Sequence, residues 1–91
     1  MPLGGARLRT PEGRVNQCGL RVRERRRELR LKQDALCARI ATATEGEWNP
    51  DRLEVLRIEQ GTRTVTDVEL LALARALNCH FCWLLSGENP P

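Results

Sequence analysis

The chain has 91 residues, of which 15 are Lys or Arg and 12 are Asp or Glu, and its formal net charge is +3. This length predicts a single small domain. No apolar run approaches the ~18 residues that a membrane helix needs, and no apolar segment typical of a secretion signal follows the amino terminus. We therefore expect a cytoplasmic protein without a membrane partner, whose four cysteines stay reduced.

The charge is unevenly distributed along the chain. Residues 1–40 carry eleven Arg or Lys and four Asp or Glu, whereas residues 41–91 carry four and eight. A basic half beside an acidic half indicates a face that meets a polyanion. Fourteen of the fifteen basic residues are Arg, which suits bidentate contacts to phosphate or guanine. The low aromatic content argues against a stacking surface for RNA or single strands.

Residues 1–15 contain three Gly and two Pro without an apolar period, which predicts a disordered basic arm. Such an arm is either a solvated tail or a minor-groove contact, and its basic residues are Arg7, Arg9 and Arg14. The first helix is predicted at 16–29, with a narrow apolar stripe formed by Cys18, Val22 and Leu29. The many Arg residues of this helix fit a solvated face and a phosphate-facing role equally well.

A second helix is predicted to begin at Lys32 and to bury Leu36, Cys37 and Ile40. The connection at 43–49 contains Gly46, which ends the helix. In the pair Asn49-Pro50, Asn is a preferred N-cap and Pro suits the first helical position. The third helix is therefore predicted at 50–60, with Gly61 as its C-cap.

The sequence Thr66-Asp67-Val68-Glu69 has the pattern of a capping box and starts a fourth helix that runs to about Leu77. A short fifth helix is predicted at 81–85, and no segment alternates as a strand does. The fold class is therefore all-α with five short helices, in a domain at 16–87 that is followed by a tail at 88–91.

Together these residues resemble the lambda-repressor-like helix-turn-helix proteins, the Cro/C1 or xenobiotic-response-element family. The similarity runs from about Gly19 to Gly87, which is most of the ordered chain. Its motifs are Val22-Arg23, Arg26, Leu31-Lys32-Gln33, Leu36-Cys37, Val55-Leu56-Arg57-Ile58-Glu59-Gln60-Gly61, Leu70 to Leu77, and Leu84-Leu85-Ser86-Gly87. The connection at 43–49 is longer than the ~3–4 residues usual for this motif. Gly46-Glu47-Trp48 looks like a lengthened variant of the turn, in which we expect Trp48 to pack onto the core.

The resemblance implies roles for individual positions. Base contacts fall at Arg52, Leu53, Glu54 and Arg57. Phosphate contacts fall at Lys32, Gln33, Thr62, Arg63 and Thr64. Arg26 and Glu59 fall where family members form a partly buried salt bridge, and Gln33 also falls where it would support the third helix. The acidic residues near the proposed reading face are Glu45, Glu47, Asp51 and Glu54. Glu54 could accept a hydrogen bond from cytosine or simply repel phosphate.

The resemblance implies a transcriptional regulator, in the first place a repressor, that inserts residues 50–60 into the major groove of double-stranded DNA as a homodimer. Phe81, Trp83 and Leu84 are the candidate dimer contacts. An alternative is a protein-interaction module on the same fold, such as an antitoxin-like partner of a toxin, which Leu53 and Leu56 favour. A third alternative is a thiol or zinc sensor.

The sensor alternative depends on Cys79-His80-Phe81-Cys82, because two close thiols at a helix start can bind zinc or have a lowered pKa. No second such pair exists in the sequence, and the remaining cysteines lie on predicted core faces. Cys79 also matches a core position of the family. No nucleophile and base occur in a known catalytic pattern. We therefore expect no metal, no cofactor and no enzymatic activity.

Overall fold

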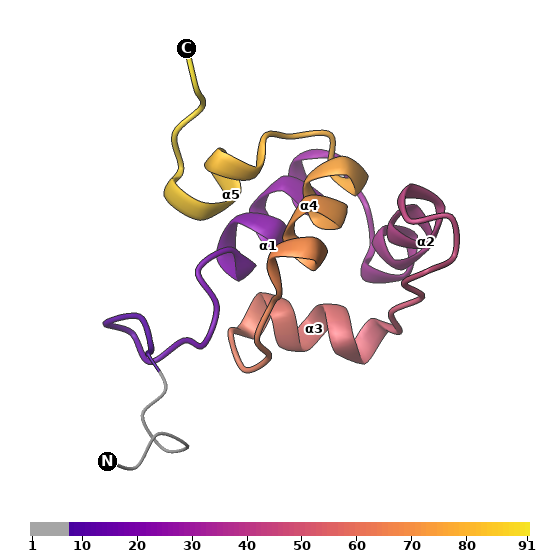
Figure 1. Cartoon of the computed structure of the whole chain (residues 1–91). Helices are drawn as coiled ribbons and strands as arrows, with labels where there is room; N and C mark the ends of the chain where they lie inside the picture. Colours follow the sequence, from indigo (N-terminus) through magenta and orange to yellow (C-terminus); the bar gives the residue numbers. More distant parts are fainter. Residues whose placement is uncertain (1–7) are drawn as a thin grey trace.

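The computed structural model describes residues 8–91, which form five α-helices and no strand (Figure 1). The helices are α1 (Gly19–Glu28), α2 (Gln33–Ala43), α3 (Arg52–Gln60), α4 (Asp67–Ala76) and α5 (Phe81–Ser86). The all-α class predicted from the sequence is confirmed. No helix in this part of the chain has the length and apolar character needed to cross a membrane.

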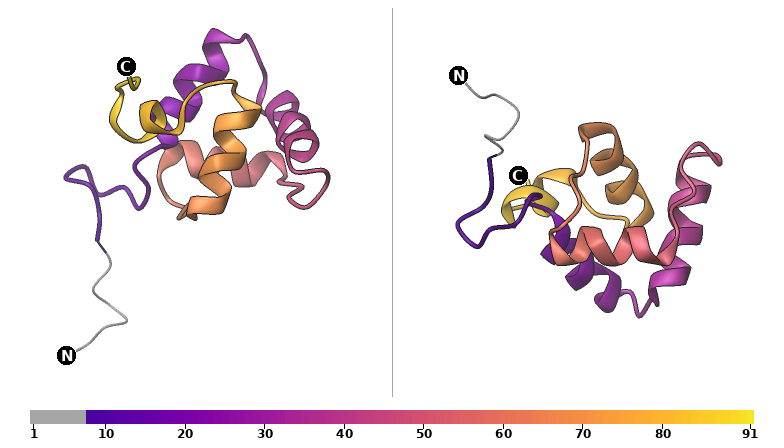
Figure 2. Two further views of the ribbon diagram at one scale, coloured as in Figure 1. Left: turned by 45° about the horizontal axis from the view of Figure 1, so that its top comes forward. Right: turned by 90° about the horizontal axis from the view of Figure 1, so that it is seen from below.

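One core joins the five helices. α1 packs on α3 and α5, while α2 packs on α3 and α4. α3 lies along one edge of the bundle, and the view from below in Figure 2 shows it running between α1 and α4. Burial of each large aliphatic side chain stabilises the fold by about 1.5–3 kcal/mol. The largest fully buried aliphatic side chains are Val22, Leu36, Ile40, Val55, Ile58, Leu73, Leu77 and Leu84.

α1 begins at Gly19 rather than at residue 16, because Asn16 has a different task. The Asn16 side-chain oxygen accepts a hydrogen bond from the Gly19 backbone N–H at 2.8 Å. Gly19 also passes very close to α3, and a Cβ there would lie 2.0 Å from the Ile58 carbonyl oxygen. Only glycine fits this approach without moving one of the two backbones.

α3 begins at Arg52, two residues later than predicted, and its N-cap is Asp51 rather than Asn49. The Asp51 carboxylate accepts a hydrogen bond from the Glu54 N–H at 2.8 Å, whereas Asn49 donates to the Gly46 carbonyl. Pro50 is buried one position before the cap. Pro50 and Val55 therefore occupy the N′ and N4 positions of a hydrophobic staple around the Asp51 cap.

The other helix ends agree with the sequence. Gly61 has φ 77° as the C-cap of α3, and Gly46 has φ 82° after α2. The capping box of Thr66 and Glu69 is present at the start of α4. Trp48 packs against the core, as predicted for the long connection.

The described part of residues 1–15, which the sequence predicts to be a disordered arm, contains a hydrogen-bonded turn. Thr10 to Arg14 form a closed turn, in which the Gly13 N–H donates to the Thr10 carbonyl at 2.8 Å and the Thr10 N–H to the Arg14 carbonyl at 2.9 Å. The Val15 N–H then donates to the Gly61 carbonyl at 2.9 Å, which joins the turn to the end of α3. Arg7 lies outside the described residues.

Candidate nucleic-acid interface

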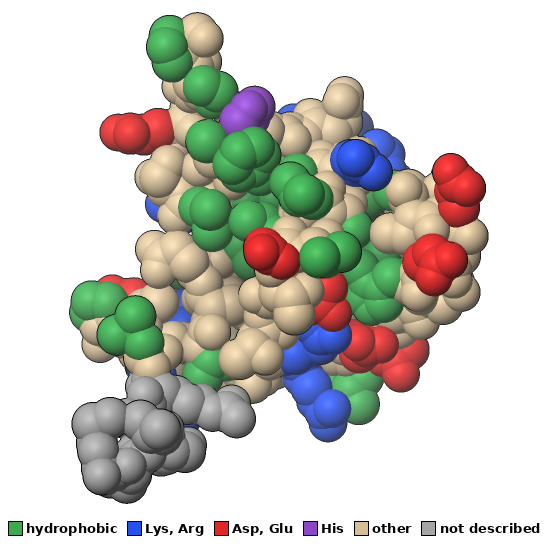
Figure 3. Space-filling model, viewed as in Figure 1, with side chains coloured by type: hydrophobic (Ala, Val, Ile, Leu, Met, Phe, Trp, Pro, Cys, Tyr) green, Lys and Arg blue, Asp and Glu red, His purple; other side chains and the backbone are tan. Residues whose placement is uncertain are grey.

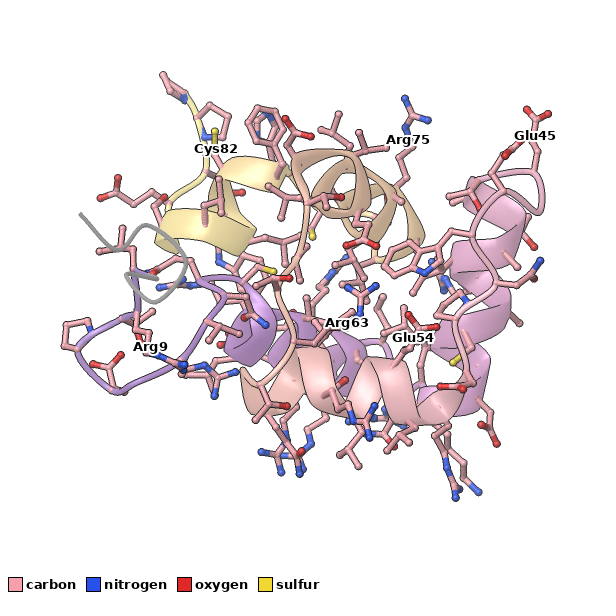
Figure 4. The ribbon with its side chains drawn as sticks, turned by 60° about the horizontal axis from the view of Figure 1, so that its bottom comes forward. Arg9, Glu45, Glu54, Arg63, Arg75 and Cys82 are labelled. Carbon is pink, nitrogen blue, oxygen red and sulfur yellow. The ribbon has the colours of Figure 1, made fainter. Side chains whose placement is uncertain are left out.

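The outer face of α3 presents the residues predicted to contact bases. Arg52, Leu53 and Arg57 are exposed, and 49% of the Leu53 surface is accessible. Val55 and Ile58 point into the core from the opposite face. Within residues 8–91, the side chains of Arg52 and Arg57 form no hydrogen bond or salt bridge. Figure 4 shows nitrogen-bearing side chains projecting from the outer side of α3.

The Arg26–Glu59 pair predicted from the sequence is present and joins α1 to α3. Arg26 Nε donates to Glu59 Oε2 at 2.7 Å, and Arg26 Nη2 donates to Glu59 Oε1 at 3.0 Å. The two side chains are only 11% and 3% exposed. The carboxylate raises the pKa of Arg26, so this guanidinium stays charged. Gln33 also donates to Glu59 Oε1, at 3.3 Å, and so braces α3 as predicted.

The end of α3 is also held by the segment before α1. Asn16 Nδ2 donates to the Ile58 carbonyl at 3.0 Å and to the Arg63 carbonyl at 2.8 Å, while Arg14 donates to the Glu59 carbonyl. Carbonyl groups in the last turn of a helix have no partner within the helix. Asn16 and Arg14 therefore supply hydrogen-bond donors to carbonyl groups at the end of α3. These bonds fix α3 against the segment that precedes α1.

The beginning of α3 is held by Arg63, from the loop between α3 and α4 (Figure 4). Its two Nη atoms donate to both oxygens of Glu69, at 3.0 and 2.9 Å, and Nη2 also donates to Glu54 at 3.1 Å. The guanidinium carbon lies 5.6 Å from the Trp48 ring centroid, within the range of a cation–π interaction. We call Arg63, Glu54, Glu69 and Trp48 the Arg63 clamp.

The Arg63 clamp contains two residues that are predicted to contact DNA. The sequence predicts a phosphate contact at Arg63 and a base contact at Glu54, and in the structure Arg63 binds the carboxylates of both Glu54 and Glu69. Hydrogen bonding to Arg63 lowers the pKa of Glu69, and the same bonds raise the pKa of Arg63. Glu54 therefore has a partner within the protein, and it shares the single positive charge of Arg63 with Glu69. Glu45 lies at the far end of α2, away from the outer side of α3 (Figure 4).

The remaining predicted phosphate contacts lie around α3 but are not gathered at one point. Lys32 is exposed just before α2, and Gln33 is half-buried against Glu59. Thr62 and Thr64 are exposed in the loop after α3. Acidic side chains appear over the α2–α3 connection on the face drawn in Figure 3.

The predicted dimer contacts separate into two environments. Phe81 is 40% exposed and Trp83 is half-buried against the core. Leu84 is fully buried, so its assignment to a dimer surface is wrong. A helix of six residues has too few turns for the sequence to show which side faces inward.

Cys18, Cys37 and Cys79 do not have the environment of reactive thiolates. Burial raises the pKa of Cys18 to about 11 and also raises the pKa of Cys37 and Cys79. No group of three or more His, Cys, Asp or Glu side chains in residues 8–91 is arranged to hold a metal ion. The lowered pKa on which a thiol sensor would depend is therefore not found at Cys79.

Sequence reasoning missed Asn16, Arg14 and the clamp role of Arg63. Asn16 and Arg14 bond to α3 residues that lie 42 and 45 positions away, and no local spacing marks such partners. For Arg63, a signal was present, because Glu69 of the capping box lies six residues later.

No protein-family model, curated protein or solved structure matches this chain.

Proposed function

We propose that the protein is a double-stranded DNA-binding regulator in which α2 and α3 form a helix-turn-helix. The observation that carries the proposal is the outer face of α3. A helix fixed at both ends displays Arg52 and Arg57 with no partner in residues 8–91, and its other face is bound to the core. A recognition helix needs such a rigid, one-sided display to enter the major groove.

The charges support this assignment. Arginine binds guanine O6 and N7 through two parallel hydrogen bonds, and each good contact of this kind is worth ~1–3 kcal/mol of discrimination. The Glu54 carboxylate is held by Arg63, which it shares with Glu69, so it is engaged within the protein. The exposed Lys32, Thr62 and Thr64 can position the helix on phosphates without reading sequence.

The experiment is a titration of selected and scrambled duplexes over a salt series. Affinity should fall steeply with salt, by a slope of roughly 0.9 in log units per phosphate contact. Arg52→Ala and Arg57→Ala should each reduce the preference for the selected duplex, by up to ~1–3 kcal/mol. Arg75→Ala, which removes an exposed arginine from α4, should leave the preference unchanged. Binding without salt dependence, or none at micromolar concentration, would refute the proposal.

One observation favours a protein-interaction function on the same fold. A groove of about 530 Å³ lies between the α2–α3 connection and α4, and its apolar lining includes Trp48, Val68, Leu71 and Ala72. Val68 and Leu71 are 74% and 47% exposed. If the duplex titration fails, Leu71→Glu tests this second function, since it should abolish binding to a protein partner while the fold is kept.

A further inference from the structure

A cleft lies at the end of α3, between the N-terminal turn on one side and the loop after α3 on the other. Its volume is about 570 Å³. The side chains that can contact a ligand there are Arg9, Arg57, Arg63, Thr62 and Thr64, and no acidic residue of the described chain lines it. We call it the Arg9 cleft. A basic cleft with hydroxyl groups and no acidic lining suits an anion with several acceptor oxygens.

The position of Arg9 follows from the hydrogen bonds of the turn. Arg14 and Val15 bind carbonyl groups at the end of α3, and the turn from Thr10 to Arg14 is closed by its own backbone. Arg9 directly precedes this closed turn and is thereby held at the cleft (Figure 4). Its one hydrogen bond within residues 8–91 is a contact of 3.3 Å from Nη1 to the Gly13 carbonyl. Most of its donors therefore face solvent.

The three arginines of the cleft are not equivalent. Both Nη atoms of Arg63 are bound to carboxylates of the Arg63 clamp, so Arg63 adds no free charge. Arg57 and Arg9 have no carboxylate partner in residues 8–91. Arg57 comes from the outer face of α3, and Arg9 comes from a part of the chain 48 residues earlier. The cleft thus joins the proposed reading face to the N-terminal turn.

We propose that the Arg9 cleft binds a backbone phosphate of the DNA that α3 reads, with Arg9 as a phosphate contact supplied by the N-terminal turn. This inference rests on the proposed function. A phosphodiester has acceptor oxygens for the Arg9 guanidinium and for the Thr62 or Thr64 hydroxyl, which leaves Arg57 for a base in the groove. The contact strengthens binding independently of sequence and sets the register of α3.

The test compares three proteins: the unmodified whole chain, the Arg9→Ala variant and the Arg75→Ala variant. For each one, duplex binding is measured over a salt series. Arg75 is the matched control, because it is also an exposed arginine but lies on the opposite side of the molecule (Figure 4). Arg9→Ala should lower the slope of log K against log salt by about 0.9, which corresponds to one phosphate contact. The reduction should be the same for selected and scrambled duplexes. Arg9→Lys keeps the charge and should restore the slope.

The outcomes separate this inference from the proposed function. If the unmodified chain binds duplexes with a steep slope and Arg9→Ala behaves as Arg75→Ala does, the cleft is not a phosphate site and only this inference fails. If Arg9→Ala weakens binding to the selected duplex and to the scrambled duplex by different amounts, Arg9 contacts bases. That result would also overturn this inference. If the chain binds no duplex, an NMR titration with inorganic phosphate decides the source. Shifts at Gly13, Thr62 and Thr64 that Arg9→Ala abolishes would show a site for free phosphate and overturn the assignment to DNA.

Discussion

The two ends of α3 are held by different kinds of interaction. The last turn is tied to the chain before and within α1 through buried groups, namely the Arg26–Glu59 pair and Asn16. The first turn is tied to the following loop through the Arg63 clamp, whose charged side chains are 22–34% exposed. Water competes for the clamp but reaches the other end poorly. We therefore expect the buried end to determine whether the domain folds, and the clamp to adjust the orientation of α3.

The largest effect should come from Glu59→Ala. This change leaves Arg26 charged and almost buried without its partner, and breaking a buried pair in this way costs about 3–5 kcal/mol. This cost is a large part of the free energy of unfolding of a domain of this size. Thermal and urea unfolding followed by circular dichroism should show a large loss of stability. Glu28→Ala, which removes the 52% exposed partner of Arg25, is the control and should change little. If Glu59→Ala and Glu28→Ala have equal melting temperatures, the buried end of α3 does not determine whether the domain folds.

A smaller but clear loss should follow Asn16→Ala. It removes the donor to the Ile58 and Arg63 carbonyls and the acceptor for Gly19, and an unsatisfied buried polar group costs about 1–3 kcal/mol. Asn49→Ala is the matched control, because Asn49 is exposed and has one hydrogen bond, to Gly46. Urea unfolding should separate the two variants. If Asn49→Ala costs as much, the connection before α3 matters as much as its buried end.

The smallest effect should be a pH-dependent one at the clamp. The pKa of Glu69 is lowered in the folded protein from its ordinary value of 4.5, so its ion pair with Arg63 stabilises the fold above that pH. The stabilisation, about 1 kcal/mol for a partly exposed pair, is lost as the pH falls through the lowered pKa. Glu69→Gln keeps a capping side chain but removes the charge. The melting temperatures of the unmodified protein and Glu69→Gln should differ at pH 7, and the difference should vanish only as the pH falls through the lowered pKa of Glu69. A difference that persists in acid would show that the charge is not its cause.

The sequence predicted what depends on local order or on the resemblance to a known family. The capping box at Thr66, the C-cap at Gly61 and the Arg26–Glu59 pair are all present. The predicted start of α3 is two residues too early because Asn49 and Asp51 are both good N-caps, and the choice between them is visible only in the structure, where Asp51 caps the Glu54 N–H and Asn49 binds Gly46. The side chains of Asn16 and Arg14 could not be assigned, because their partners are distant carbonyl groups that carry no side-chain signal. Leu84 was misassigned because a six-residue helix shows no clear period.

The short length of α3 has a consequence for the protein during its synthesis. Nine residues are too few for a stable isolated helix, since helices below ~12–15 residues are marginal in water. Its supports come from both directions along the chain, from Asn16 and Arg26 upstream and from Arg63 and Glu69 downstream. A nascent chain that has emerged from the ribosome only as far as Gly61 therefore lacks the clamp. We expect the proposed reading surface to reach its final form only once Glu69 has left the exit tunnel.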